Sequence, residues 1–523
     1  MSENEWQKLC SESDLKESIP AAFDLGKNRV LAIRQGTMVH ACGGKCTHYG
    51  APLEQGFLRG HILTCPWHNA KFDIATGKTK AAPALTHLKH YEARIEGGDV
   101  YVRPIAAPAP RIRPETAGQT ILILGSGAAG NAAAETLRDE GFAGRLILIS
   151  PEDALPYDRP NLSKDFLAGK AKPEWIPLHS RKFYDDRNIQ FIHGKATAVD
   201  AAACTITLDS GEKLSWDRLL LATGARPRPL SIPGANKKGV FLLRSRADSE
   251  DIVKALEGAR SAAVIGASFI GLEAASALRS RGLEVCVIGP ESIPLGKVFG
   301  EQIGAWLQGI HESQGVKFHL GRTPVEVTGG DSVEGIRLDD GTLVTADVVI
   351  AGIGVTPVLD YLPAAGIVSG NAVPVDSCLR TSLDGIFAAG DIAAVPYAPI
   401  DRRIRVEHWA VAQRQGQHAA RAMLGSKEPF GEIPFFWTRQ HEMSLCYLGW
   451  AAAYDRIVFR GAFGKEGFLA GFYEKGTLRA VVSLRRSTDL NILGELLKDG
   501  IAVSPDVFAD EKTALQSLLP EKK

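Results

Sequence analysis

The hydrophobic positions follow three successive patterns along the 523 residues of the chain. Residues 1–105 carry short β-rich runs between glycine turns, such as Arg29–Ile33 and Val100–Val102, and no long amphipathic helix. From residue 119 onward, apolar runs typical of buried strands alternate with alanine-rich stretches typical of helices, which predicts βαβ units around a parallel sheet. From residue 431 onward, the strand-like runs Arg456–Phe459 and Ala480–Leu484 precede a predicted helix over Asp489–Leu497.

These changes of pattern divide the chain into four predicted domains, in line with its length. We expect a multidomain fold in which a β-rich domain precedes two α/β Rossmann-like dinucleotide-binding domains and a C-terminal α+β domain. The boundaries are 1–105 for the β-rich domain, 106–118 for an Ala/Pro linker, 119–232 and 353–430 for the first α/β domain, 233–352 for the second, and 431–523 for the C-terminal domain. Because proline fixes φ, the linker is expected to be semi-rigid, and it would let the first domain dock and move away.

Composition and charge narrow the function classes. The 60 basic and 60 acidic residues cancel, so the chain lacks the charge excess of a nucleic-acid-binding protein or a polybasic membrane patch. The first 17 residues do not have the pattern of a signal peptide, and no apolar run is long enough for a transmembrane helix, so we expect a cytoplasmic protein. In that compartment the eight cysteines are expected to be thiols or metal ligands, and three of them crowd into residues 42–65.

Two short segments of the first domain combine one cysteine and one histidine each. Cys46-Thr-His48 is followed after 16 residues by Cys65-Pro-Trp-His68. Two thiolates and two imidazoles are the ligands of a Rieske [2Fe–2S] centre, in which the neutral imidazoles raise the reduction potential above that of all-cysteine clusters. A zinc site of two cysteines and two histidines is the alternative, although zinc sites usually pair like ligands within one segment. The third cysteine of the group, Cys42, is expected to be a packed or free thiol.

Two glycine-rich turns predict two dinucleotide-binding folds in tandem. In the first, the apolar run from Thr120 enters Gly125-x-Gly127-x-x-Gly130, a helix over 131–140 follows, and Glu152 lies 22 residues beyond the last glycine. Glycines at these positions let the backbone approach a pyrophosphate at the helix N-terminus, and the acid can accept a hydrogen bond from a ribose hydroxyl.

The second fold departs from this pattern at two positions. Ser268 replaces the middle glycine in Gly266-x-Ser268-x-x-Gly271. The acid that usually ends the next strand is displaced, since Gly289 stands there and Glu291 follows two residues later. No clear arginine for a 2′-phosphate is present, so the sequence leaves NADH and NADPH both open.

Longer segments of the first domain resemble a known family. Cys46-Thr-His-Tyr-Gly-Ala-Pro-Leu53, Cys65-Pro-Trp-His68 and Phe72-Asp-Ile-Ala-Thr-Gly77 resemble Rieske domains of the ferredoxin type. The additional cysteine in each loop of the respiratory bc proteins has no counterpart here, so their disulfide is absent. The resemblance implies a one-electron carrier with a [2Fe–2S] cluster held by Cys46, His48, Cys65 and His68.

The rest of the chain resembles the flavoproteins that have two dinucleotide-binding domains. The strand ends in Leu219–Ala225 and Ile386–Asp391 carry this likeness. Leu155–Lys164, and the segments at 243–244, 352–357, 407–409 and 434–437, are similar to the ferredoxin reductases of oxygenase systems and to the apoptosis-inducing-factor group. Taken whole, the chain resembles the Rieske-bearing apoptosis-inducing-factor-like proteins, whose bacterial members are FAD-dependent reductases.

This resemblance implies that FAD lies on the first dinucleotide fold and NAD(P)H on the second. The residues implied in FAD binding are Gly125, Gly127, Ala128, Ala129, Gly130, Glu152, Arg159, Lys164, Ala196, Arg244, Asp391, Glu407, His408, Trp409 and Trp437. Those implied in NAD(P)H binding are Gly266, Ser268, Ile270, Gly271, Glu291 and Gly354. Lys164 and Glu273 are implied as a catalytic pair beside flavin N5, where the hydride arrives and where a cation stabilises the reduced flavin.

The combination favours an NAD(P)H-dependent reductase that passes electrons through FAD to its own Rieske cluster and on to an external acceptor that the sequence does not identify. FAD is the step at which electron pairs from nicotinamide become single electrons for the cluster. One alternative is a redox-responsive signalling flavoprotein of the apoptosis-inducing-factor type with slow turnover. Another is a Rieske oxygenase, which needs a mononuclear iron site whose two histidines and carboxylate are not evident. We expect a monomer or a homodimer.

Overall fold

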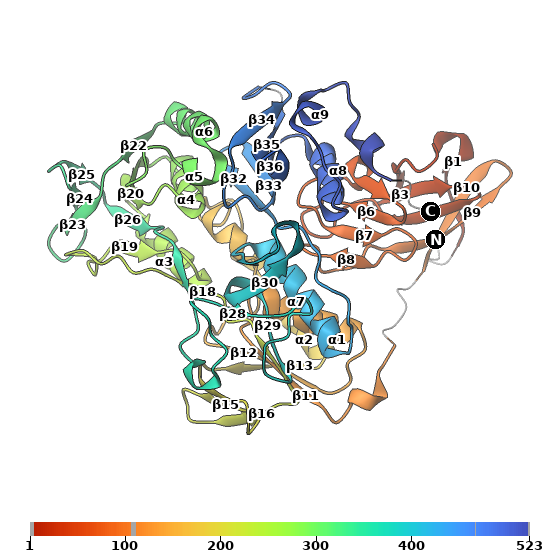
Figure 1. Ribbon diagram of the computed structural model, residues 1–523, viewed down its shortest axis with the longest axis horizontal. Coiled ribbons are helices and arrows are strands. Elements are labelled where there is room, and N and C mark those ends of the chain that lie inside the picture. The colour runs from red at the N-terminus through yellow and green to blue at the C-terminus, as the bar shows by residue number, and fades with distance from the viewer. Residues whose placement is uncertain (1–4, 106–110, 466, 521–523) are drawn as a thin grey trace.

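The N-terminal domain consists of two antiparallel sheets, and the computed structural model describes residues 5–105, 111–465 and 467–520 of the chain (Figure 1). The larger sheet has the strand order β1-β10-β9-β4-β3-β2. Its strands are β1 (Gln7–Ser11), β2 (Ala21–Leu25), β3 (Asn28–Gln35), β4 (Met38–Gly43), β9 (His90–Glu96) and β10 (Asp99–Ile105). A smaller sheet of order β5-β6-β7-β8 is inserted between β4 and β9, with strands β5 (Phe57–Arg59), β6 (Ile62–Thr64), β7 (Lys71–Asp73) and β8 (Thr79–Ala81).

Strand β3 is buried on both faces, which explains why its apolar run is continuous. Successive side chains of a strand point to opposite faces. Val30 and Ala32 therefore pack into the core of the larger sheet, whereas Leu31 and Ile33 pack into a second core that contains the candidate cysteine ligands. The loops that carry the predicted cluster thus rest on a fixed apolar base.

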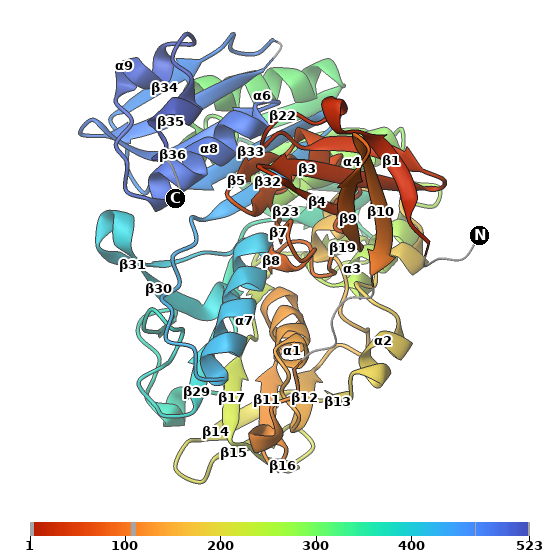
Figure 2. The ribbon, with the colours of Figure 1, turned by 90° about the vertical axis from the view of Figure 1, so that its right-hand side faces the viewer.

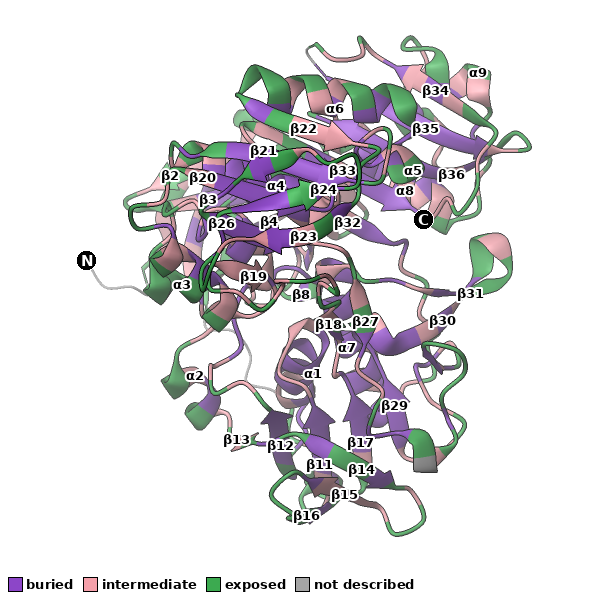
Figure 3. Ribbon diagram, turned by 90° about the vertical axis from the view of Figure 1, so that its left-hand side faces the viewer, coloured by how far each residue is buried: buried purple, intermediate pink, exposed green. Residues whose placement is uncertain are grey.

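The first α/β domain has a five-stranded parallel sheet of order β13-β12-β11-β17-β29. Its strands are β11 (Thr120–Leu124), β12 (Arg145–Ser150), β13 (Ile189–His193), β17 (Arg218–Leu221) and β29 (Ile386–Ala388). Helices α1 (Ala128–Asp139) and α7 (Trp409–Met423) lie side by side (Figure 2). They approach closely because residue 416 is glycine: a Cβ at Gly416 would lie 2.0 Å from Ala129 O. Figure 3 shows that β11, β12 and β17 are buried along most of their length.

The second α/β domain repeats this plan with the order β19-β26-β20-β21-β22. Its strands are β19 (Val240–Leu242), β20 (Ser261–Ile265), β21 (Glu284–Gly289), β22 (Val316–Leu320) and β26 (Val348–Ala351), and its main helices are α3 (Arg246–Ala255), α4 (Phe269–Ser280) and α6 (Glu301–Ser313). The antiparallel strands β18 (Ala225–Pro227) and β27 (Val355–Pro357) pair where the chain enters and leaves this domain. The two α/β domains are therefore joined by two crossings of the chain.

The C-terminal domain is an antiparallel sheet of order β32-β33-β36-β35-β34 with helices on it. Its elements are β32 (Phe435–Gln440), β33 (Met443–Gly449), β34 (Arg456–Arg460), β35 (Phe468–Glu474), β36 (Thr477–Leu484), α8 (Ser487–Lys498) and α9 (Pro505–Ala509). Within the described ranges, no helix has both the length and the apolar character needed to cross a membrane.

The predicted fold class is confirmed, while element limits shift by a few residues. The helix predicted over 131–140 begins at Ala128, because Gly127 is its N-cap. The structure of the linker segment differs more from the prediction. Residues 106–110 lie outside the described residues, and the second half of the linker packs on the first α/β domain instead of acting as a spacer. There Arg113 N donates to Gly141 O at 2.9 Å, and Thr116 is buried.

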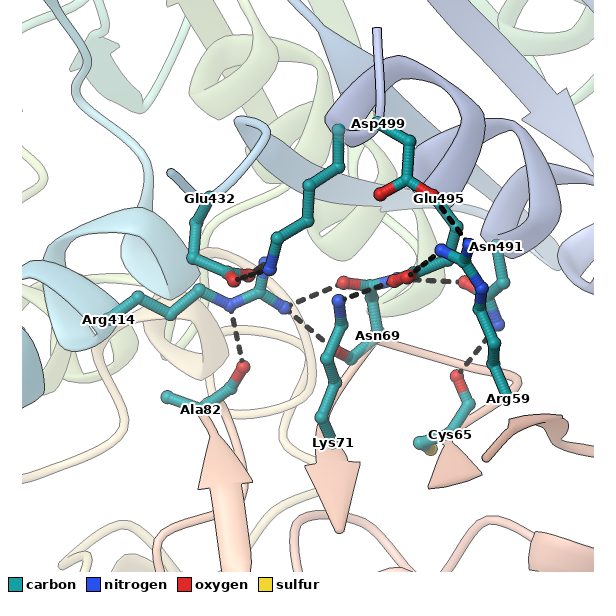
Figure 4. A network of polar contacts seen from close by, with 11 residues as sticks. Arg59, Cys65, Asn69, Lys71, Ala82, Arg414, Glu432, Asn491, Glu495 and Asp499 are labelled. Atoms are coloured by element: carbon teal, nitrogen blue, oxygen red, sulfur yellow. Dashed lines mark hydrogen bonds and ion pairs between the residues drawn. The ribbon is translucent and has the colours of Figure 1, made fainter. Parts of the chain in front are cut away.

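A buried polar network docks the N-terminal domain against helices α7 and α8 (Figure 4). Arg414 of α7 is its centre, with a side chain that is only 3% exposed. Its guanidinium donates to Ala82 O at 3.0 Å, to Asn69 O at 2.7 Å and to Asn69 Oδ1 at 2.7 Å. Glu432 lies 3.3 Å from the same group. Because a buried charge is costly without such partners, the guanidinium is fully satisfied only while the N-terminal domain is in place.

Helix α8 supplies the second part of this network. Asn491 accepts a hydrogen bond from Asn69 Nδ2 at 2.8 Å and donates one to Cys65 O at 3.4 Å. One turn further on, Glu495 lies 3.0 Å from Arg59 of β5. The loop that carries the second pair of predicted ligands is thus held from two sides, by α7 and by α8.

The charge on Glu432 makes the stability of this network depend on pH. Burial raises the pKa of Glu432, but Lys71, Arg414 and Lys498 together hold it well below its ordinary value. The contribution of this carboxylate to stability is therefore complete above the pKa of an exposed glutamate, about 4.3, and is lost as the pH falls toward the depressed value. At neutral pH the network is in its charged form.

Replacing Arg414 by methionine should loosen the N-terminal domain without unfolding the rest. The substitution leaves the oxygens of Asn69 and Ala82 without their donor, which we expect to weaken docking by about 3 kcal/mol. Hydrogen–deuterium exchange in β5–β8 should then be faster by about 100-fold. The control is Arg421→Met on the same helix, whose ion pair with Glu140 is 33% and 39% exposed and is worth little. Equal exchange in both variants would contradict the docking role of Arg414.

Candidate functional site

Two loops of the N-terminal domain bring two thiols and two imidazoles together. Cys46 and His48 follow β4, and Cys65 and His68 lie between β6 and β7. The cysteines are 3% and 1% exposed, and the neighbouring Cys65 thiol raises the pKa of Cys46. The imidazoles approach with their Nδ1 atoms 3.2 Å apart. The four predicted ligands therefore meet as a thiol pair and an imidazole pair.

This arrangement fits a [2Fe–2S] cluster with two thiolates on one iron and two imidazoles on the other. A separation of 3.2 Å between the two Nδ1 atoms can be bridged by one ion through two bonds of about 2 Å. Burial lowers the pKa of His48 to about 3 and that of His68 well below its ordinary value. Both rings are therefore neutral at pH 7 and can offer a nitrogen lone pair to a metal. Separate thiol and imidazole pairs do not favour the alternative of one tetrahedral zinc ion.

A cavity of about 310 Å³ lies at the carboxyl edge of the first parallel sheet. The predicted residues that line it are Gly125, Gly127, Ala128, Ala129, Glu152, Arg159, Lys164, Arg244, Asp391, Glu407, His408, Trp409 and Trp437, together with Ile270 and Glu273 of the second fold. Further lining residues inside the segments that carry the resemblance are Ser126, Pro160, Ser163, Ala222, Thr223, Gly224, Gly390 and Phe436, and those outside these segments are Ser150, Pro151, Phe269 and Ala412. Gly130 and Ala196 do not line it. Ala196 lies in β14 (Ala196–Asp200) and packs in the core.

Close contacts with neighbouring backbone atoms require glycine at two positions of the turn at the head of the cavity. Gly125 has φ of +105°, and a Cβ there would lie 2.2 Å from Ala222 O. A Cβ at Gly130 would lie 1.8 Å from Gly125 O. Gly130 therefore serves the packing of helix against turn, while Gly125 and Gly127 leave the helix N-terminus open toward the cavity.

Polar groups along the cavity fit an elongated dinucleotide. Arg159 lies 2.9 Å from Glu152, and Arg244 lies 3.1 Å from Asp391. His408 Nδ1 is buried and has no hydrogen-bond partner within the described chain. Burial lowers the pKa of His408 to about 3, so the ring is neutral and this nitrogen is available to a ligand. A phosphate turn, an acid beyond it and an orphaned nitrogen at the far end match the parts of FAD.

Lys164 and Glu273 meet at the wall between the two α/β domains. Their charged atoms are 2.7 Å apart, and the side chains are 12% and 5% exposed. Glu273 also accepts hydrogen bonds from Ser163 and Thr438, each at 2.6 Å. Three donors hold this carboxylate in one orientation, so Lys164 has a fixed partner beside the cavity.

A chain of hydrogen bonds continues from Thr438 away from the cavity. Gln440 Nε2 donates to Thr438 Oγ1 at 3.2 Å, and Gln440 Oε1 contacts His311 Nε2 at 2.9 Å. His311 Nδ1 in turn lies 3.1 Å from His441 Nε2. Since the amide oxygen only accepts, His311 carries its proton on Nε2 and His441 donates to it. These residues orient Glu273, and no local sequence pattern indicated them.

The turn of the second fold explains the serine that replaces glycine. Gly266 has φ of +106°, and a Cβ at Gly271 would lie 2.0 Å from Gly266 O. Ser268 is the N-cap of α4, where its Oγ accepts from Gly271 N at 3.2 Å and donates to Gly352 O at 2.9 Å. The side chain therefore closes the turn and caps the helix.

The carboxylate of Glu291 lies at the end of β21, although the residue follows that strand in the sequence. A Cβ at Gly289 would lie 2.5 Å from Glu291 Oε2, so a side chain at 289 would displace that carboxylate. Glu291 Oε2 is buried and has no partner within the described chain. Gly354, with φ of +99°, lies beside Arg228, next to the paired strands β18 and β27 that join the two α/β domains.

Trp437 joins the two centres. Its side chain lines the first cavity, and its ring centroid lies 4.4 Å from that of His68 with an interplanar angle of 36°. The opposite imidazole, His48, is stacked on Tyr49 at 4.0 Å. The hydroxyl of Tyr49 donates to Asp158 of the first α/β domain. The imidazole pair is thus in direct contact with the wall of the cavity.

Comparison with protein families matches three parts of the chain. The pyridine nucleotide-disulphide oxidoreductase model covers residues 119–416. The Rieske [2Fe-2S] domain model covers residues 5–92, and the reductase C-terminal model covers 435–519.

Individual relatives agree with this division. Apoptosis-inducing factor 3 of Homo sapiens is 33% identical over 514 residues, which are 95% of this chain and 84% of that protein. The 5,5′-dehydrodivanillate O-demethylase ferredoxin reductase subunit of a Sphingobium species is 36% identical over 76% of this chain and 97% of its own. Among solved structures, the ferredoxin reductase for the CYP199A2 system of Rhodopseudomonas palustris has a TM-score of 0.74 and 33% identity, and covers 76% of this chain and 99% of its own.

A double-mutant cycle tests the pairing of Lys164 with Glu273. Each single variant, Lys164→Met or Glu273→Gln, removes one partner of a nearly buried pair and should lower the free energy of unfolding by about 3 kcal/mol. The double variant should lose less than the sum, with a coupling of about 1–3 kcal/mol. The exposed pair Arg181 and Asp185, at 63% and 55% exposure, is the control and should couple by less than about 0.5 kcal/mol. Additive losses at 164 and 273 in urea unfolding would show that the two charges act independently.

Proposed function

Because the chain belongs to the pyridine nucleotide-disulphide oxidoreductase family and carries a Rieske domain, we propose that it passes electrons from NAD(P)H through FAD to its own [2Fe–2S] cluster and on to an external acceptor. It is an NAD(P)H-dependent oxidoreductase of the ferredoxin reductase type, with FAD, NAD(P)H and a [2Fe–2S] cluster as its redox groups. The internal electron path and the external acceptor are the parts that we add.

The contact of Trp437 with His68 is the observation that carries this proposal. One face of the tryptophan belongs to the FAD cavity, and its ring lies 4.4 Å from the imidazole of a cluster ligand. A conjugated ring between two redox centres shortens the distance that an electron must cross through empty space. The Rieske loops are also held there by Arg414 and Asn491, so the contact does not depend on a chance encounter.

Relatives with separate carriers support the same direction of flow. A covalent complex of putidaredoxin reductase with putidaredoxin has a TM-score of 0.72 and 30% identity, and covers 77% of this chain and 98% of its own. In that protein the acceptor is a second molecule. Here a domain with predicted cluster ligands is part of the chain and is docked at the cavity wall, which favours the N-terminal domain as the first acceptor.

The residues around the cavity have distinct parts in this reaction. Bound FAD supplies the change from hydride transfer to single-electron transfer. The helix N-terminus at Gly127 would hold the pyrophosphate, and Glu152 a ribose hydroxyl. Lys164 places its ammonium group at the cavity wall, and Glu273, 2.7 Å away, fixes the direction of that side chain. Positive charge at that wall stabilises a reduced, anionic ring system relative to the oxidised one.

Replacing the ligand Cys46 by serine separates the steps of the proposed path. In an anaerobic NADH titration of the holoenzyme, the wild-type protein should lose flavin absorbance and gain the EPR signal of a reduced cluster. The C46S variant should lack that signal and lose acceptor reduction by at least about 100-fold, as expected when a single obligatory step is removed. The rate of flavin reduction should stay unchanged.

The control is Cys204→Ser, because Cys204 is a partly exposed thiol of the first α/β domain outside both centres. It should behave as the wild type in both readouts. A wild-type protein whose flavin is reduced while the cluster stays oxidised would contradict the path and favour the signalling flavoprotein with slow turnover.

The position of Glu291 points to NADH as the preferred coenzyme. Its unpartnered carboxylate oxygen lies at the end of β21, where it can accept from a ribose 2′-hydroxyl and repels a 2′-phosphate. Glu291→Gln should reduce the ratio of kcat/KM for NADH over NADPH by about tenfold, and the ratio of the two dissociation constants should change equally. Glu284→Gln, at the exposed start of the same strand with 76% exposure, is the control. An unchanged ratio in E291Q would rule out this role.

A further inference from the structure

Three exposed aromatic rings gather around one cavity. Among the Phe, Tyr and Trp residues in the described ranges, the exposed ones are Tyr49, Trp67 and Trp175, at 42%, 45% and 62% exposure. All three line the same hollow of about 1050 Å³, which is separate from the FAD cavity. Large apolar rings that remain in contact with water at one place mark a binding surface more often than they arise by chance. The cavity adjoins the predicted cluster ligands, and no ligand has been assigned to it above.

The cavity lies where electrons would leave the cluster. His48 and His68 form part of its lining, and Lys164 and Trp437 form part of the wall shared with the FAD cavity. A molecule in this space touches the imidazole ligands directly. Its volume is just above the range of about 300–1,000 Å³ that is typical of small-molecule sites. Its concave shape suits an inserted ligand better than a flat protein surface.

The charges at the rim select the kind of ligand. Arg439 and Asp165 form an ion pair with each other. Lys170 and Arg485 also line the cavity, are exposed, and form no ion pair within the described part of the chain. Apart from Asp165, Glu442 is the only acid among the described lining residues. The rim is therefore net positive, and it favours a ligand with negative charge beside an aromatic body.

We propose that this cavity binds the terminal electron acceptor, and that the acceptor is a planar aromatic oxidant of the quinone class that carries an acidic group. The inference rests on the proposed function, because the cluster must be reduced before it can deliver electrons here. Trp67 and Trp175 stack on the ring system, Lys170 and Arg485 hold the acidic group, and the imidazole pair is the point of electron exit.

The overall reaction balances without a further reductant. NAD(P)H, one proton from solvent and the quinone give NAD(P)⁺ and the hydroquinone. The hydride supplies two electrons and one proton, the C–H bond of the dihydronicotinamide breaks, and two quinone carbonyls become hydroxyls. A bound cluster would supply the two electrons one at a time, which suits a quinone because its reduction proceeds in single-electron steps.

The test uses the holoenzyme with 1,4-naphthoquinone-2-sulfonate and its uncharged parent, 1,4-naphthoquinone. Trp175→Ala should raise KM for both quinones by about fivefold, the loss expected for one aromatic contact. Lys170→Gln should raise KM for the sulfonate alone by about threefold, the loss expected for one rim charge. Calorimetric dissociation constants for the oxidised protein without coenzyme should change by the same factors. Leu343→Ala, at an exposed residue of the second α/β domain (55% exposed), is the control and should change neither.

The outcomes separate this inference from the proposed function. If NADH reduces the cluster but neither quinone binds, or if both KM values in W175A equal those of the wild type, the inference is wrong and the proposed function stands. Full quinone reduction by the Cys46→Ser variant would place the reaction at the flavin and overturn the inference as well. A cluster that NADH does not reduce would instead overturn the proposed function, whatever the quinones do.

Discussion

The buried guanidinium of Arg414 determines where the cluster loops lie relative to the FAD cavity. Helix α7 begins at the cavity, where His408 and Trp409 line the wall, and reaches the N-terminal domain little more than one turn later at Arg414. The contact of Gly416 with Ala129 O fixes the same helix on α1. One rigid element therefore touches the nucleotide turn, the cavity and the cluster loop, and the contact between Trp437 and His68 follows from its position.

The fold and the chemical classes of the site could be predicted because their signals are local. Gly125 and Gly130 restrict each other across a single turn, and each cluster loop holds its cysteine and histidine within four residues, so short motifs carry the information. Alternating strand and helix patterns likewise revealed the two parallel sheets. Ala196 packs in the core and does not line the cavity, so its contact with FAD stays a prediction from the resemblance alone.

The residues that assemble the site could not be predicted from one sequence. Arg414 bonds to Asn69 across 345 positions, and Thr438 bonds to Glu273 across 165. Such pairs produce no periodic pattern in the sequence, because each residue forms hydrogen bonds with a buried group on a different element. The departures in the second fold gain a physical reason only in three dimensions: Ser268 caps α4, and the absence of a side chain at Gly289 admits the carboxylate of Glu291.

On the proposed path, the docked N-terminal domain would also change the kinetic order of electron transfer. A separate carrier must diffuse to its reductase, so the rate depends on the concentration of both proteins and on ionic strength. With the carrier on the same chain and clamped by buried contacts, transfer becomes a unimolecular event whose rate is the same in a dilute and in a crowded cell. On that path, the internal step would not depend on the concentration of a separate carrier protein, and no other carrier could compete for it.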